Sequence, residues 1–144
     1  MAEVVAHFAP TGRTHHIHAT GAYGTELFPE CLRELGADIT GDHHMDIREY
    51  IRDMADCLAA ADLVICRAGA STVSELTALG VPAIMVPSPY VTNNHQEKNA
   101  RALETHGGVE VLLEQDSSGQ ALFQTAAGIL HDDVRREAMA SAMA

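Results

Sequence analysis

Short apolar runs alternate with longer segments of helical periodicity along this chain. The runs predict five buried strands, at 15–20, 37–40, 62–66, 83–86 and 109–113. Helices are predicted at 3–9, 23–35, 47–60, 72–79 and 93–106, and one or two more within 118–144. Strands and helices that alternate over short connections predict an α/β fold in which helices cover both faces of a Rossmann-like parallel sheet.

One of these helices is predicted from periodicity alone. Ile47, Ile51, Met54 and Leu58 recur at three- and four-residue spacing, which places them on one face of a helix. The segment 37–40 before it is short and apolar, and it predicts the second strand.

The chain begins in a helix, whereas a doubly wound domain normally begins with a strand. We therefore expect the first strand of the sheet to be missing. In the strand order 3-2-1-4-5-6 that strand is central, and its loss costs about 1–3 kcal/mol for each backbone group left buried and unsatisfied. This predicts marginal stability, rearrangement or self-association of the chain.

Composition narrows the function classes. With 144 residues and 47% hydrophobic content, the chain accommodates a single domain with a real core. A net charge of −11 disfavours nucleic-acid binding, which requires clustered basic residues. There is no apolar run of about 20 residues to span a bilayer and no signal peptide. The three cysteines indicate reduced thiols in a cytoplasmic protein.

Nine histidines raise the question of a metal site. They gather in two groups, His15, His16 and His18, and then His43 and His44. In a strand His16 and His18 share a face, but no cysteine or carboxylate nearby completes a zinc spacing. Surface histidines without a metal are therefore expected, and no cofactor is predicted.

The segment 61–75 is the most informative part of the sequence. A buried strand at 63–66 leads into a small-residue turn with Gly69, and a helix follows at Ser71 and Thr72. Such a helix start offers free backbone N–H groups and a partial positive charge to a phosphate. Because the turn lacks both the dinucleotide-binding and the P-loop glycine patterns, it predicts another phosphate-bearing ligand.

Three linked segments, 62–75, 78–83 and 86–100, resemble the C-terminal domain of the MurG family of glycosyltransferases, family 28 with the GT-B fold. The similarity covers about the whole chain. The resemblance implies the donor-binding half of a hexosyltransferase that moves N-acetylglucosamine from UDP-N-acetylglucosamine to lipid I. That reaction makes lipid II for peptidoglycan and so serves cell wall biogenesis, cell shape and division.

The resemblance also implies what the chain leaves out. The acceptor-binding N-terminal domain, with its histidine general base and a glycine-rich loop, has no counterpart in residues 1–144. The chain would then be a single donor-binding domain without catalytic residues, inactive alone, and lipid I would bind through the missing domain. The complete enzyme would sit at the cytoplasmic face of the membrane as a peripheral protein.

Residue roles follow from the family positions. Ile51 would meet uracil through its backbone and Met54 would line the base pocket, although an apolar helical stripe by itself predicts core packing for both. The diphosphate would lie among the residues at the helix start, Ala70, Ser71 and Thr72.

Glu75 would bind the ribose hydroxyls and Gln96 the hydroxyls of the sugar, with His95 where some members carry a second glutamine. Residue chemistry leaves alternatives open. Glu75 could cap its own helix in a capping box with Thr72, and Gln96 could be a solvated or capping side chain. Arg67 could pair with the diphosphate or equally with Glu75 or another acid.

A second function class also fits the sequence. The chain could be a non-catalytic UDP-sugar-binding subunit that works with a separate acceptor-domain partner. A UDP-sugar epimerase of GT-B architecture is a weaker third alternative, because its residue pattern is not seen here.

Overall fold

The computed structural model describes residues 1–144, which divide into two compact units, 1–54 and 55–144. Each unit is described by itself. The first unit contains helix α1 (Ala2–Phe8) with a 3-10 turn (Ala9–Thr11), strand β1 (His16–Ala19), helix α2 (Gly21–Glu34) and strand β2 (Met45–Arg48). None of the helices in the chain is long and apolar enough to cross a bilayer.

The core of the first unit lies between its two helices and a two-stranded sheet. β1 and β2 pair in parallel, with His16 opposite Met45. Val5 of α1 and Phe28 and Leu32 of α2 are buried against apolar side chains that include Met45. Amphipathic helices thus bury one stripe on one face of a parallel pair of strands.

Two predictions in the first unit are wrong. The second strand is β2 rather than 37–40, because Gly36 (φ +73°) and the Asp38 carboxylate, which accepts the Thr40 N–H at 2.9 Å, turn the chain there. The helix over 47–60 is confined to α3 (Met54–Ala60). Parallel pairing with β1 extends the backbone through Ile47, and Ile51 lies before the start of α3, so neither residue is helical.

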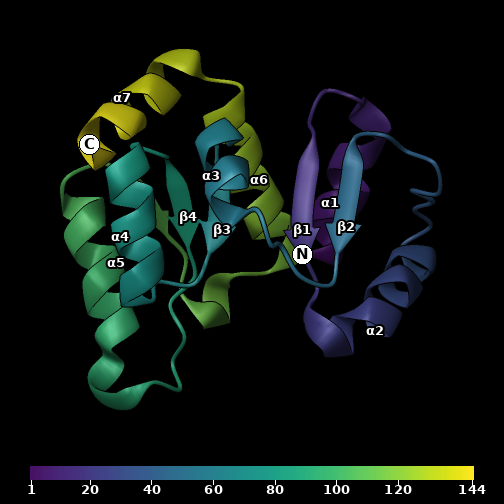
Figure 1. The fold of residues 1–144 in the computed structure, drawn as a ribbon, viewed down its shortest axis with the longest axis horizontal. Helices are drawn as coiled ribbons and strands as arrows, with labels where there is room; N and C mark the ends of the chain where they lie inside the picture. The colour runs from purple at the N-terminus through teal and green to yellow at the C-terminus, as the bar shows by residue number, and fades with distance from the viewer. The chain divides into compact units, whose positions relative to one another are not determined.

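The second unit is built on a three-stranded parallel sheet in the order β3-β4-β5. Its elements, after α3, are β3 (Val64–Cys66), α4 (Ala70–Leu79), β4 (Ala83–Met85), α5 (His95–Thr105), β5 (Val109–Val111), α6 (Gly119–Leu130) and α7 (Asp133–Met143). Short 3-10 turns precede α5 (Thr92–Asn94) and follow β5 (Glu114–Asp116). α4 and α5 lie side by side on one side of the sheet and α6 lies on the other (Figure 1).

Local sequence signals determine where the helices of this unit begin and end. Gly80 ends α4 in the left-handed conformation (φ +68°), and the Val81 N–H returns to the Leu76 carbonyl at 3.1 Å. Ser118 and Asp132 cap α6 and α7 through their side chains. The end of α4 at Gly80 and the presence of two helices within 118–144 agree with the sequence predictions, whereas α4 begins two residues before the predicted start at 72.

The α/β class with parallel strands and covering helices is confirmed. The strands belong to two sheets, so β1 and β3 each have one neighbour and one free edge. The N–H groups of His16 and Thr20 donate to the carbonyls of His44 and Arg48 on the side of β2. Because successive N–H groups of a strand point to opposite sides, those of Ile17 and Ala19 point to the free edge. That a further strand completes the sheet, and that residues 1–144 form one domain, stay predictions.

Two histidines predicted at the surface are instead half-buried in the first unit. The ring of His16 lies 5.3 Å from that of Phe8, and the ring of His18 lies 4.7 Å from that of Phe28. Burial lowers the pKa of both imidazoles below 6.5 because the charged form loses its hydration. The neutral rings serve as packing groups.

This burial makes the first unit sensitive to acid. The unfolded histidines bind protons at pKa 6.5 and the folded ones only at lower pH, so stability is fully present above the unfolded pKa and is lost as the pH falls through the folded pKa. We expect the urea midpoint to fall on acidification from about pH 7.5 to about pH 5.5. His18→Phe, which keeps a ring against Phe28, should flatten this dependence. A midpoint that rises on acidification would contradict the assignment.

Candidate functional site

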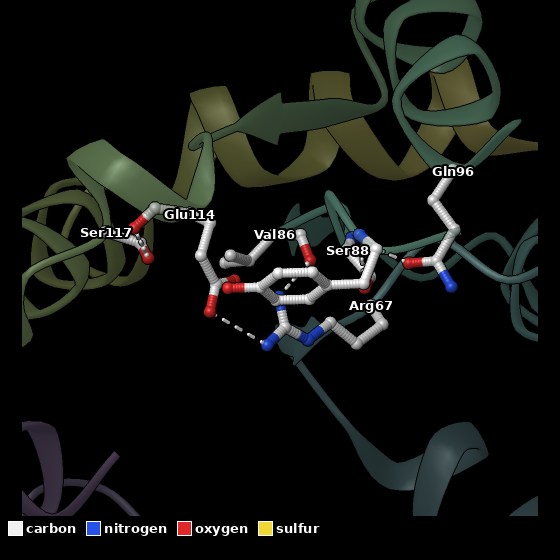
Figure 2. A network of polar contacts seen from close by, with 7 residues as sticks. Arg67, Val86, Ser88, Gln96, Glu114 and Ser117 are labelled. Carbon is white, nitrogen blue, oxygen red and sulfur yellow. Dashed lines mark hydrogen bonds and ion pairs between the residues drawn. The ribbon is translucent and has the colours of Figure 1, made fainter. Parts of the chain in front are cut away.

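The carboxyl ends of β3, β4 and β5 meet at one edge of the three-stranded sheet, where ligands bind in open α/β folds. Arg67 follows β3, and its guanidinium donates to the Val86 carbonyl at 3.1 Å, just beyond β4. The same guanidinium forms a forked ion pair with Glu114, which follows β5 (Figure 2). Arg67 therefore ties together the segments that leave all three strands.

Two amide side chains of α5 hold the same edge from the side. The Ser88 N–H donates to Oε1 of Gln96 at 2.9 Å (Figure 2). Nδ2 of Asn99 donates to the carbonyl oxygen of Ala68 at 3.2 Å, and Ala68 is fully buried. Because Gln96 and Asn99 are three residues apart, they lie on one face of the helix. They fix the turn after β3 and the loop after β4.

The start of α4 lies directly beyond Arg67 and Ala68. Gly69 is its N-cap in an extended conformation (φ −67°, ψ 151°), with no side-chain cap, and the first helical hydrogen bond runs from the Val73 N–H to the Gly69 carbonyl. The N–H groups of the first turn, at Ala70, Ser71 and Thr72, are therefore at the open end of the helix. A Cβ added at Gly69 would meet nothing within 4 Å, so space is open there.

The two capping interpretations of the sequence are wrong. α4 begins at Ala70, two residues before Thr72, so Thr72 is not its N-cap and Glu75 is not part of a capping box. Glu75 is instead an exposed carboxylate in the second turn. At α5 the N-cap is Asn94, whose side chain donates to Glu97.

A cleft of about 550 Å³ opens beside these residues. It is lined by residues of the loop after β4, the start of α5 and the segment after β5, namely Pro87, Pro89, Tyr90, Asn94, Glu97, Leu113, Glu114 and Gln115. Asn93 and Asn94 both adopt left-handed backbone conformations (φ 55° and 53°) at its rim. Strained backbone of this kind is frequent at ligand sites, and asparagine tolerates it better than most residues do.

The sequence analysis did not single out Glu114 or Asn99. Glu114 had one available signal, because it follows its strand as Arg67 follows β3, and parallel strands end together. The signal for Asn99 was its three-residue spacing from Gln96, which places both side chains on one face of the helix. Arg67 was predicted to pair with either an anion or an acid, and the acid is Glu114.

The remaining predicted site residues lie in different places. His95 is exposed as the first residue of α5. Ile51 is half-buried after β2, and Met54 begins α3, 41% exposed. Both belong to the first unit, so their meeting with the residues of the second unit stays a prediction.

Charge at this edge is balanced by the Arg67–Glu114 pair. Hydrogen bonds from Arg67 lower the pKa of the Glu114 carboxyl, and the same contact raises the pKa of Arg67. Burial raises the pKa of the neighbouring Cys66 thiol to about 11, so this thiol stays protonated at neutral pH and is a poor nucleophile. The structure contains no cluster of three metal-ligating side chains. The open N-terminus of α4 and the guanidinium of Arg67 are groups of the kind that bind phosphate in proteins.

Comparison with known proteins agrees with this geometry. A family model described as the glycosyltransferase family 28 C-terminal domain matches residues 2–144. The chain belongs to this family. The resemblance inferred from its sequence is therefore confirmed.

Relatives of this family 28 domain carry one recurring name, UDP-N-acetylglucosamine--N-acetylmuramyl-(pentapeptide) pyrophosphoryl-undecaprenol N-acetylglucosamine transferase. The protein of that name from Desulforudis audaxviator is 41% identical over 142 residues, 99% of this chain and 38% of the relative. The one from Acetivibrio thermocellus is 56% identical over 97 residues, 67% of this chain and 26% of the relative. The chain thus spans well under half the length of these relatives.

Solved structures show the same fold. The crystal structure of Acinetobacter baumannii MurG matches with a TM-score of 0.75 and 26% identity, over 98% of this chain and 40% of that one. The glycosyltransferase VinC matches with a TM-score of 0.73 at 15% identity, over 99% of this chain and 32% of that one, which shows the fold alone. The family 28 domain therefore has the architecture of a GT-B C-terminal half.

The Asn99 contact predicts a measurable effect on stability. Asn99→Asp keeps the size of the side chain but removes the amide donor and places a carboxylate against the Ala68 carbonyl. We expect a loss of about 1–3 kcal/mol in the free energy of unfolding, measured by urea denaturation. Gln124→Glu, the same change at an exposed position of α6, should cost less than about 0.5 kcal/mol. Equal effects of the two substitutions would show that the Asn99 contact does not stabilise the fold.

Proposed function

We propose that this chain is the donor-binding half of an N-acetylglucosaminyltransferase that takes UDP-N-acetylglucosamine as donor. The observation that carries the proposal is the carboxyl edge of the sheet, where Arg67 and the open N-terminus of α4 lie three residues apart. The names of the relatives, at 41% and 56% identity, supply the substrate. The complete reaction would transfer N-acetylglucosamine to an undecaprenyl-pyrophosphoryl acceptor, lipid I.

The diphosphate is the best-supported part of the ligand. Helix dipoles and free N–H groups favour phosphate at the first turn of α4, around Ala70, Ser71 and Thr72. The hydroxyl of Ser71 is exposed there, and Gly69 leaves room for an oxygen to approach the backbone. Arg67, three residues before the helix start, would supply positive charge to the same ligand.

Roles for the nucleoside and the sugar follow from the family positions. Glu75 would accept hydrogen bonds from the ribose hydroxyls, because its exposed carboxylate is not used as a helix cap. The side-chain oxygen of Gln96 accepts the Ser88 N–H, so its NH₂ group would be left to donate to a sugar hydroxyl. His95 is its neighbour in the sequence. Ile51 and Met54 would meet the uracil ring.

Partners and location belong to the same proposal. Lipid I would bind to a separate acceptor domain, and the complete protein would work as a peripheral protein on the cytoplasmic face of the membrane, where this lipid is glycosylated. The free edges of β1 and β3 make self-association of the isolated chain part of the proposal.

Gly69 offers a test that separates binding from folding. Its backbone is extended and its Cβ position is empty, so Gly69→Ala introduces no strain. The lower entropy of its unfolded chain should roughly offset the poorer N-cap and keep the free energy of unfolding within about 1 kcal/mol of the wild type. The added methyl group would occupy the space proposed for the diphosphate, and calorimetric titration should show UDP binding weakened at least about tenfold, the equivalent of about 1.4 kcal/mol.

Gly80→Ala is the control for this test. Gly80 is left-handed (φ +68°), so its substitution should cost about 1–2 kcal/mol of stability and leave UDP affinity unchanged. Undiminished UDP binding by Gly69→Ala would contradict the proposed diphosphate position.

A UDP-sugar-binding subunit that works with a separate acceptor-domain partner is the second candidate, because it would bind the donor through the same carboxyl edge and the same start of α4. In both cases the acceptor must be aligned and deprotonated by groups outside this chain. We expect no sugar transfer from labelled UDP-N-acetylglucosamine to a lipid I analogue by the chain alone. Transfer restored by adding an acceptor-domain polypeptide would favour the two-subunit enzyme, and lipid II formed by the chain alone would contradict the proposal.

A further inference from the structure

The guanidinium of Arg67 has two partners of different strength. One is the neutral carbonyl of Val86 at 3.1 Å, and the other is the Glu114 carboxylate, which takes both arms of the fork (Figure 2). A forked guanidinium matches a carboxylate and a phosphate in the same way. The carboxylate therefore occupies the position on Arg67 that a phosphate would take.

The pair is placed where it can open. The side chains of Arg67 and Glu114 are 51% and 40% exposed, so water can hydrate both charges when they separate. The contact to Val86 does not depend on Glu114 and holds the guanidinium at the end of β4. Glu114 also lines the cleft at this edge, into which its carboxylate can turn.

We propose that Glu114 is an internal competitor of the donor, which occupies Arg67 in the empty site and must be displaced by the diphosphate. The proposal rests on the proposed function for the identity of the ligand, but its chemistry is that of any pyrophosphate. Glu114 thus sets the affinity for the phosphorylated ligand.

The test compares the binding of inorganic pyrophosphate and of UDP to the wild type and to Glu114→Gln by calorimetry. The glutamine keeps the size of the side chain and removes the competing charge. We expect both ligands to bind about two- to fivefold more tightly, the equivalent of an exposed ion pair. In an Arg67→Gln background the same substitution should have no effect on pyrophosphate binding, because no guanidinium is left to release.

Glu110→Gln is the matched control. Glu110 pairs with Arg135 in the same unit, with both side chains 40% exposed, so its substitution makes the same charge change in a similar pair in the middle of β5. It should leave pyrophosphate affinity unchanged. An equal gain from both variants would show that net charge alone is responsible and would overturn the proposal.

A second measurement uses the unmodified chain. Carbon-13 NMR of the Glu114 carboxyl should show its pKa rising toward the ordinary glutamate value when pyrophosphate is added, because Arg67 leaves it. Pyrophosphate that binds Glu114→Gln no better than wild type, or that binds none of the variants, would overturn the proposal. Tighter pyrophosphate binding without UDP binding by any variant would support the competition and refute the proposed donor instead.

Discussion

Pairing of the buried strand β4 with β3 on one side and β5 on the other is the constraint on which the second unit depends. Every residue of β4 is fully buried, and its neighbours are parallel to it, so the three carboxyl ends must lie at one edge. Helices on both sides cover the faces, which leaves that edge as the place where polar side chains can gather. The position of the candidate site therefore follows from the parallel direction of the three strands.

Polar side-chain contacts then fix the conformation of this edge. Arg67 bridges the segments after the three strands, while Gln96 and Asn99 fasten two of them to α5. The contacts to Val86, Ser88 and Ala68 use backbone carbonyl or N–H groups that lie beyond the strand ends and have no sheet partner. The same bonds that satisfy the strand ends therefore hold the start of α4 in the position where a phosphate would bind.

The two units of the chain use polar side chains differently. In the first unit the half-buried rings of His16 and His18 pack against Phe8 and Phe28. In the second unit the exposed Arg67–Glu114 ion pair lies at the carboxyl edge. The family model covers both units.

The sequence by itself determined the α/β class, the family and most of the second unit, because strand 62–66, the helix after it and Gly80 are local signals of hydrophobic run, turn and left-handed end. It also singled out Arg67 and Gln96 as candidates from their motif, and both make polar contacts at the carboxyl edge. Only the tertiary structure decided that Ile47 belongs to a strand, since its helical spacing yields to parallel pairing with β1. It also decided that Arg67 meets Glu114, 47 residues away. Periodicity describes neighbours within a few residues, whereas strand partners and ion pairs are selected by the packing of segments far apart in the chain.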